Sequence, residues 1–270
     1  MVFNNQYSLS INGKMISAGK TFGVVNPATE EVFAEAPDAS RTHLDEAVAA
    51  AKAAFPAWSG RPIVERKELV AAIGKCLEDN REEFSRLITL EQGKSRAGSD
   101  FEIDLSASWC RGVAEYDLPA TIIEDSSERT VEVRHTPIGV VGAITPWNVP
   151  ILIAIWKLAP ALLAGNTVVL KPSPFTPLAT LKLGELLQDV LPAGVLNVIS
   201  GGNELGQWMT DHPDIGKVSF TGSTATGKKV MESASKTLKR VTLELGGNDA
   251  AIVLPDVDPK AIAPALFWGA

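Results

Sequence analysis

The feature that most constrains this sequence is a regular alternation that begins after Pro137. Short apolar runs alternate with stretches of helical composition, and the last run ends at Leu245. Runs that are apolar at consecutive positions are typical of strands covered on both faces. Strands that alternate with helices in this way form a parallel sheet between two helical layers. The pattern therefore predicts an α/β fold with a doubly wound, Rossmann-like parallel sheet. The predicted strands are 138–144, 167–170, 195–199, 217–220 and 241–245, and the predicted helices are 150–164, 177–190, 203–210 and 224–237.

The residues before this core divide into two further regions. In region 1–120, polar and apolar residues first alternate around Asn12-Gly13 and Asn26-Pro27, which indicates short strands joined by turns. Residues 121–136 are polar and β-branched and predict an exposed ribbon. Region 137–270 is the predicted α/β core. Within region 1–120, helical patterns occupy 42–56, with Thr42 as its cap, 62–79, 81–92 and 98–115.

Composition excludes several classes of function. The chain has 25 basic and 32 acidic residues, a net charge of −7, so nothing in its charge favours a nucleic-acid partner. No segment approaches the ~20 apolar residues of a membrane span, and the first residues do not resemble a secretion signal. Cys76 and Cys110 are isolated and lack metal-ligand spacing. We expect a soluble, cytoplasmic protein without a metal, a membrane or a nucleic acid as partner.

Ligands of open α/β sheets bind where the strands end, so the turns after the predicted strands form the candidate site. Two of these turns contain glycine. The turn at 202–206 and the turn at Gly222-Ser223 each follow a strand and open a helix, where backbone N–H groups favour a phosphate. A plain strand-to-helix turn fits the first equally well, and the Ser223 hydroxyl could bind a phosphate or simply cap its helix.

The second glycine turn also resembles the phosphate-binding loop of nucleotide hydrolases. Residues 222–229, GSTATGKK, match seven of the eight positions of GxxxxGK followed by Ser or Thr. The position that fails is Lys229, where Mg²⁺ needs a hydroxyl and would meet a second cation instead. Nucleotide hydrolysis is therefore disfavoured.

Three polar side chains follow predicted strands and could carry chemistry. The Lys171 ammonium could bind ribose hydroxyls or extend to water. The Asn148 amide could stabilise an oxyanion or bond to nearby backbone. Glu244 precedes Gly246-Gly247, and burial there would raise its pKa toward that of a general base, whereas a surface or ion-paired glutamate is the alternative.

In this order and at these intervals, the turns resemble the aldehyde dehydrogenase superfamily along essentially the whole chain. The resemblance implies oxidation of an aldehyde to a carboxylic acid, with NAD or NADP as cofactor and a cysteine thioester as intermediate. It also implies that the ribbon at 121–136 bridges the subunits of a homodimer or homotetramer and that region 137–270 is the dinucleotide-binding core. The motifs that carry the resemblance are Asn26-Pro27-Ala28-Thr29, Pro146-Trp147-Asn148, Lys171-Pro172-Ser173, the turn at 202–206, Phe220-Thr221-Gly222-Ser223 and Glu244-Leu245-Gly246-Gly247.

The resemblance also implies a role for individual residues. Asn148 would hold the oxyanion, and Glu244 would activate the thiol or the hydrolytic water. Lys171 would bind the adenine-side ribose, and Ser223 the pyrophosphate. The other residues expected to shape or line the cofactor site are Ile144, Trp147, Ser173, Gly202, Gly206, Phe220, Gly222, Leu245 and Gly246.

The sequence departs from the family at its catalytic thiol. Family members carry the nucleophilic cysteine a few tens of residues beyond the Glu-Leu-Gly-Gly turn, whereas this sequence ends at Ala270. Neither Cys76 nor Cys110 matches the family's cysteine motif. We expect the chain to be a truncated part of a longer enzyme, supplying the cofactor site and the general base but not the thiol, and to be inactive alone. The alternative is a non-catalytic dinucleotide-binding or scaffold protein of the same fold.

A second departure concerns the choice of cofactor. Pro174 stands where many family members have a glutamate that binds the ribose hydroxyls and repels a 2′-phosphate. Because proline removes this repulsion, the sequence is compatible with NADP as well as NAD.

Overall fold

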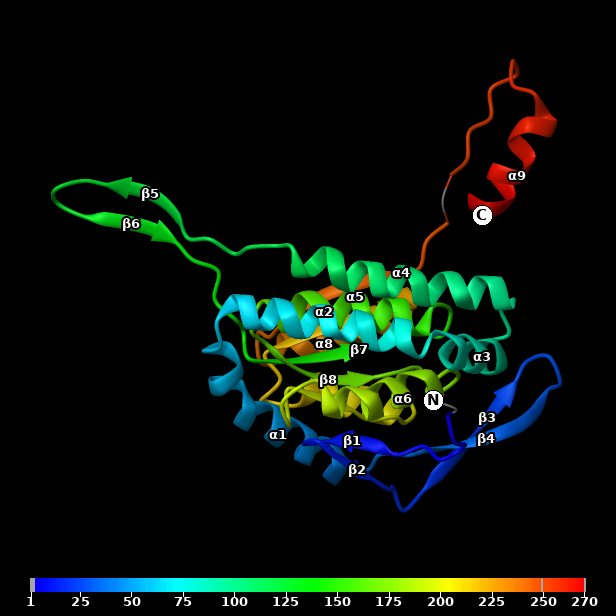
Figure 1. The fold of residues 1–270 in the computed structure, drawn as a ribbon, viewed down its shortest axis with the longest axis horizontal. Coiled ribbons are helices and arrows are strands. Elements are labelled where there is room, and N and C mark those ends of the chain that lie inside the picture. Colours follow the sequence, from blue (N-terminus) through cyan, green and yellow to red (C-terminus); the bar gives the residue numbers. More distant parts are fainter. Residues whose placement is uncertain (1–2, 249, 270) are drawn as a thin grey trace.

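The computed structural model describes residues 3–248 and 250–269, and a seven-stranded sheet forms its centre (Figure 1). The strand order is β11-β10-β7-β8-β9-β1-β2, and the five strands from β7 to β11 are parallel. These strands alternate with helices along the chain, which confirms the predicted doubly wound sheet. The strands are β7 (Val140–Ile144), β8 (Thr167–Lys171), β9 (Leu196–Val198), β10 (Lys217–Gly222) and β11 (Arg240–Leu245). The helices between them are α5 (Pro150–Leu163), α6 (Leu178–Leu186) with a short 3₁₀ turn at Leu187–Asp189, α7 (Asn203–Asp211) and α8 (Thr224–Ser235).

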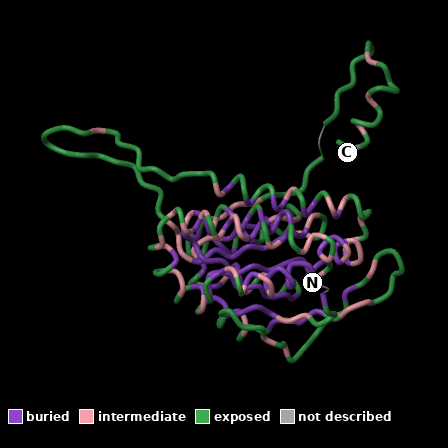
Figure 2. Tube along the Cα trace, in the orientation of Figure 1, coloured by how far each residue is buried: buried purple, intermediate pink, exposed green. Residues whose placement is uncertain are grey.

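The two faces of the sheet pack into two separate hydrophobic cores. Successive residues of a strand point to opposite faces, and β8 shows the consequence. Val168 and Leu170 belong to the core shared with α5 and α6, whereas Val169 belongs to the core shared with α7 and α8. Figure 2 shows the burial of the sheet and the inner faces of its helices. This alternation decides on which side of the sheet each site residue lies.

The first strands of the chain extend the sheet at the flank of β9. β1 (Leu9–Ile11) pairs antiparallel with β9 and with β2 (Lys14–Ile16). The backbone N–H of Asn12 donates to the Asn197 side chain at 2.9 Å and fastens this turn to β9. β3 (Thr21–Asn26) and β4 (Glu31–Pro37) form a separate hairpin. The sequence predicted these strands, but not that the first pair joins the main sheet.

Four helices follow, and both predicted ends of the first helix were wrong. The α1 helix begins after Ser40 rather than at Thr42, because the Ser40 hydroxyl accepts the backbone N–H of His43 at 3.3 Å and caps the helix. It also continues beyond Pro56, since a proline near the end of a helix removes only one N–H donor from it. The helices are α1 (Arg41–Ser59), α2 (Ile63–Asp79), α3 (Arg81–Gln92) and α4 (Arg96–Ala114).

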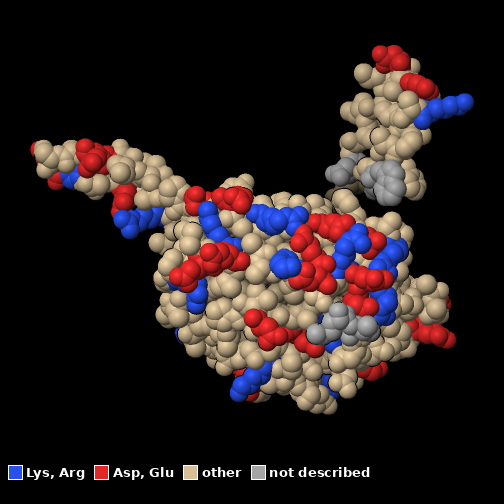
Figure 3. Space-filling model, in the orientation of Figure 1, with Lys and Arg blue, Asp and Glu red and all other residues tan. Residues whose placement is uncertain are grey.

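Two parts of the chain extend away from this body (Figure 1). β5 (Thr121–Asp125) and β6 (Thr130–Val133) form a two-stranded ribbon that is exposed, as predicted. The segment after β11 leads to α9 (Pro259–Gly269), an element that the sequence pattern did not predict. On the face drawn in Figure 3, acidic and basic side chains are intermixed. Some of the charged side chains of the chain form ion pairs, such as that of Arg81 and Asp104. Among the described residues, no helix has the length and apolar character needed to cross a membrane.

Candidate functional site

The ends of the parallel strands meet at one edge of the sheet, which we call the carboxyl edge. The strand register sets Lys171 beside Ile144 and Ile144 beside Phe220. Glu244 lies opposite Thr221, one residue further along. From β7 the chain turns to β8 and β9 on one flank and later to β10 and β11 on the other. The carboxyl edge at β7 is therefore the topological switch point, where open α/β sheets bind ligands.

The candidate residues at this edge divide between the two faces of the sheet. Ile144 and Phe220 lie in the core shared with α7 and α8. Thr221, the partner of Glu244, lies one residue beyond Phe220 and so points to the other face. On that face Ser219 accepts a hydrogen bond from Lys157 of α5. Ile144, Phe220 and Lys171, which is in register with Ile144, thus face α7 and α8, while Glu244 faces α5.

Lys171 is a buried cation at the end of β8. Its side chain is only 4% exposed, and its Nζ donates to the carbonyl oxygen of Pro172 at 3.1 Å. Burial lowers the pKa of Lys171 to about 8, and the nearby Asp38 carboxylate partly offsets this shift. Gly206 of α7 faces the lysine, since a Cβ built at that position would stand 3.9 Å from the Lys171 Cε. An ammonium carries three donors, so Lys171 can bind further acceptors at this edge.

The two glycine turns precede α7 and α8. At Gly202 the space around an added Cβ is open, so a ligand can approach the backbone there. At Gly222 an added Cβ would lie 2.5 Å from the Phe220 ring, so the position admits only glycine without rearrangement. Ser223 caps α8, because its hydroxyl accepts the backbone N–H of Thr226 at 3.2 Å. The capping alternative therefore holds for Ser223, whose exposed position also leaves it accessible to a ligand.

The turn after β7 carries Trp147 and Asn148, whose side chains are exposed. Its backbone is held from two sides. The Lys94 ammonium donates to the carbonyl oxygen of Asn148 at 2.8 Å, and the Thr176 hydroxyl donates to the carbonyl oxygen of Trp147 at 3.3 Å. In the neighbouring turn, the buried Ser173 hydroxyl accepts the backbone N–H of Phe175 at 3.2 Å. Ser173 thus contributes to the shape of this turn.

The expectation that Glu244 is buried was wrong for this structure. Its side chain is exposed, because β11 is the edge strand and pairs with β10 alone. Leu245 packs against α8, where a Cβ at Gly227 would lie 2.5 Å from a Leu245 methyl group. Gly246 and Gly247 have open space around them, so backbone or ligand can approach the carboxylate closely.

Sequence reasoning missed Lys157, the one charged residue of α5. Its Nζ donates to the Ser219 hydroxyl at 3.1 Å. Burial lowers the pKa of Lys157 to about 8, and attraction to Glu244 partly offsets this effect. A single charge in the otherwise apolar stretch PILIAIWKLAPALL was the signal that could have identified it.

The two cysteines lie in the helical layer rather than at the carboxyl edge. Cys76 belongs to α2 and Cys110 to α4, where Cys110 packs closely against Gly74. Burial raises the pKa of these thiols to about 11 and about 12. The thiolate is the reactive form of cysteine, and a raised pKa keeps both thiols protonated near neutral pH. Neither cysteine is therefore suited to act as a nucleophile.

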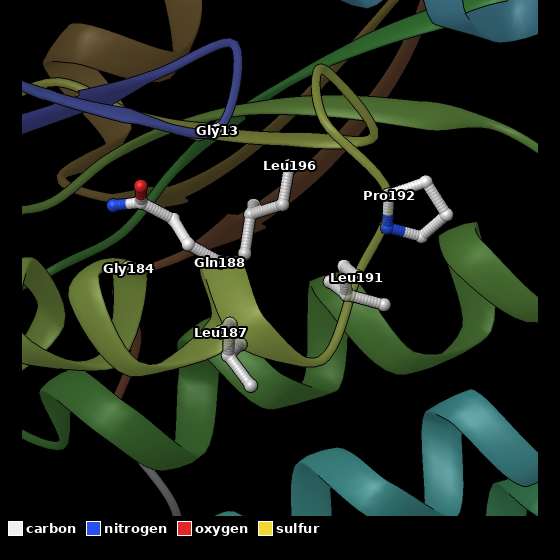
Figure 4. Close-up of a pocket in the computed structure, with 7 residues that line it drawn as sticks. All are labelled: Gly13, Gly184, Leu187, Gln188, Leu191, Pro192 and Leu196. Carbon is white, nitrogen blue, oxygen red and sulfur yellow. The ribbon is translucent and has the colours of Figure 1, made fainter.

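Of two hollows, one lies away from the carboxyl edge and the other lies at it. A cavity of about 10 Å³ beside the first residue of β9 is lined by Leu187, Leu191 and Leu196 (Figure 4). It could hold at most one water molecule. A groove of about 600 Å³ runs beside the start of α7. Gly202, Asp38 and Trp208 are among the residues that line it, so it lies at the carboxyl edge. Among the described residues, no group of His, Cys, Asp or Glu side chains could hold a metal ion.

The residues at the carboxyl edge fit a dinucleotide. Lys171 offers a buried cation to ribose hydroxyls, and the open turn at Gly202 offers backbone N–H groups to a phosphate. The Thr145 hydroxyl at the end of β7 is buried and has no hydrogen-bond partner among the described residues. A ligand group at this edge could satisfy it.

Comparison with known proteins gives one consistent result. The family model described as "Aldehyde dehydrogenase family" matches residues 15–270. The chain is 43% identical over 269 residues to the aldehyde dehydrogenase FUS7 of Gibberella fujikuroi, covering 100% of this chain and 58% of that protein. It is 40% identical to the phenylacetaldehyde dehydrogenase of Pseudomonas fluorescens, covering 97% and 56%. The NAD⁺ complex of the aldehyde dehydrogenase from Bacillus cereus matches with a TM-score of 0.94 at 38% identity, covering 98% and 56%. The chain therefore spans a little over half the length of these relatives.

Proposed function

Because the chain belongs to the aldehyde dehydrogenase family, we propose that the whole protein oxidises an aldehyde to a carboxylic acid with NAD or NADP. This chain supplies the cofactor site and the general base, and the thiol that forms the thioester is neither of its two cysteines. The observation that carries the proposal is the alignment of Lys171, Ile144 and Phe220 at the carboxyl edge, with Glu244 one residue beyond them.

The cofactor site is built on the α7 and α8 side of the sheet. Lys171 binds the adenine-side ribose, and the backbone N–H groups that open α7 and α8 bind the pyrophosphate. When bound, the nicotinamide ring supplies the acceptor for the hydride that leaves the substrate carbon. The Bacillus cereus relative is an NAD⁺ complex, which supports the same class of ligand for this chain. The residues that line the adenosine and pyrophosphate are Ile144, Trp147, Ser173, Gly202, Gly206, Phe220, Gly222, Ser223, Leu245 and Gly246.

The chemical groups of this chain lie on the α5 side. The Asn148 amide donates a hydrogen bond to the oxyanion that forms when a thiol adds to the aldehyde. The Glu244 carboxylate accepts a proton from the thiol or from the water that hydrolyses the thioester. Its exposed position and the open space at Gly246 and Gly247 leave room for both reactants.

The exposed ribbon supports assembly with further copies of the chain. Ile122 and Ile123 are 60% and 63% exposed, and Val133 is 49% exposed. Apolar side chains gathered on a two-stranded ribbon are typical of an interaction surface. We therefore assign residues 121–136 to the interface of a homodimer or homotetramer. The two unpaired cysteines support a reducing location such as the cytoplasm.

A cofactor titration with two lysine variants tests the proposal. Lys171→Met should weaken NAD binding ~10-fold or more, since a hydrogen bond to a charged group contributes about 1.5–3 kcal/mol. Lys75→Met is the matched control, because Lys75 forms an exposed ion pair with Asp79 on α2, away from the carboxyl edge. Isothermal titration calorimetry with NAD measures both. Equal affinity in the Lys171→Met variant and the parent would contradict the proposed site.

A further inference from the structure

Lys94 and Glu102 form an ion pair that contacts the turn carrying Asn148. The proposed reaction assigns no role to this pair. Lys94 follows α3, and Glu102 belongs to α4. The Lys94 Nζ lies 2.6 Å from the Glu102 Oε2, and the two side chains are 19% and 2% exposed. Buried charges are tolerated only where they are paired and well hydrogen-bonded, so the remaining contacts of this pair are informative.

The second carboxylate oxygen of Glu102 caps α5. Its Oε1 accepts the backbone N–H of Ile151 at 2.8 Å and of Leu152 at 3.2 Å. The first N–H groups of a helix need an acceptor from outside the helix. The residue at the N-cap, Val149, has no side-chain oxygen, so Glu102 performs this task from α4.

Lys94 holds the other end of the same segment. Its Nζ donates to the carbonyl oxygen of Asn148 at 2.8 Å while it remains paired with Glu102. The ion pair therefore forms hydrogen bonds with the backbone both at Asn148 and in the first turn of α5. On the other flank, the Thr176 hydroxyl binds the carbonyl oxygen of Trp147.

We propose that Lys94 and Glu102 are positioning residues that hold the Asn148 amide in place for the oxyanion, an inference that rests on the role proposed for Asn148. A hydrogen-bond donor stabilises a developing charge only if its position is fixed before the reaction. The Asn148 side chain is exposed and lies in a short turn. The direction in which its amide points therefore depends on the backbone, which Lys94 and Glu102 hold by hydrogen bonds.

The chain offers a matched control in Glu91. This buried carboxylate of α3 caps α6, accepting the backbone N–H of Leu178 at 2.7 Å and of Ala179 at 3.0 Å. Glu91→Gln thus disturbs a buried helix cap of the same kind, but at the turn after Lys171 rather than at Asn148.

Hydrogen–deuterium exchange of the purified protein tests the positioning without requiring activity. Lys94→Met and Glu102→Gln should accelerate amide exchange ~10-fold or more at residues 148, 149, 151 and 152. The exchange rate in residues 178–182 should stay at the parental value. Glu91→Gln should show the reverse pattern. Lys94→Arg should restore slow exchange, because a guanidinium can donate to both acceptors. Parental exchange at residues 148, 149, 151 and 152 in the Lys94→Met variant would overturn the proposal.

Kinetics of the whole protein test the consequence for the reaction. Lys94→Met should lower kcat ~10- to 100-fold, the cost of a slightly misplaced group, with the KM for NAD within threefold of the parent. In an Asn148→Ala background the same substitution should change kcat less than threefold. An equal loss in both backgrounds would mean that Lys94 acts without Asn148 and would overturn the inference. If instead Asn148→Ala alone leaves kcat within threefold of the parent, the proposed function fails at Asn148, while the exchange experiment still decides whether the pair holds the turn.

Discussion

At the proposed site, the protonation of Lys171 should affect both the stability of the fold and the binding of the cofactor. Its pKa of about 8 in the folded chain lies below the ordinary value of 10.5. Between these two values the unfolded chain binds more protons, so the contribution of Lys171 to the free energy of unfolding increases as pH rises from about 8 to 10.5. Below pH 8 the buried ammonium is retained at a cost in stability, which is consistent with a group kept for binding an anion or a sugar.

The charge of Lys171 should also make the choice of cofactor depend on pH. The ammonium attracts a 2′-phosphate, and the uncharged Pro174 does not repel it. NADP affinity should therefore decrease ~5-fold relative to NAD affinity between pH 7 and pH 9, as expected for the loss of one partly screened charge contact. Titration of both cofactors at the two pH values measures this change, and Lys171→Met should abolish it. A preference for NAD beyond ~100-fold at pH 7, about 2.7 kcal/mol, would show that another residue selects against NADP.

Glu244 should matter for turnover far more than for binding. In the whole protein, Glu244→Gln should lower kcat ~10²-fold or more, the usual contribution of a general base, and leave the Kd for NAD nearly unchanged. Steady-state kinetics and a parallel cofactor titration separate the two effects. A kcat within twofold of the parent would remove Glu244 from the mechanism.

At the scale of elements, the alternation of strand residues was readable from the sequence, whereas contacts between distant helices were not. The apolar runs predicted β7 to β11 because their pattern is local. The Glu102 cap of α5 joins residues 49 positions apart and depends on how α4 packs. The exposure of Glu244 could not be predicted either, because it depends on the order of the strands, which makes β11 the outermost strand of the sheet. For α1, the capping serine Ser40 is visible in the sequence, but the predicted cap was Thr42. The predicted end of the same helix at Pro56 was also wrong, because the helix continues to Ser59.

The close packing of α6 on β9 gives a stability prediction at the same scale. A Cβ at Gly184 would lie 2.7 Å from a Val198 methyl group, so Gly184→Ala should lower the free energy of unfolding by about 1–3 kcal/mol. Gly112 of α4 has open space around it, so Gly112→Ala should instead raise this free energy by about 0.5–1 kcal/mol. Urea unfolding measures both. Equal midpoints for the two variants would contradict the described packing.

At the scale of the whole molecule, the sequence motifs predicted which residues gather at the carboxyl edge, because a parallel sheet brings its strand ends together. They could not predict Lys157, Lys94 or Glu102, whose importance arises from contacts across the sheet and between helices. The two cysteines lie in the layer of α2 and α4 with raised pKa values, away from that edge. We therefore propose that this chain contains the cofactor site and the base, and that the catalytic thiol is neither of these two cysteines.

Reduction of the cofactor in the presence of aldehydes shows whether the 270-residue chain can catalyse the reaction alone. The 270-residue chain and the whole protein are each incubated with NAD or NADP and a panel of aliphatic and aromatic aldehydes, and the absorbance of the reduced cofactor is followed. We predict sustained turnover by the whole protein, and none by the 270-residue chain, because it lacks a thiolate near the carboxyl edge. Turnover by the chain alone that disappears on Cys76→Ser or Cys110→Ser would contradict the account.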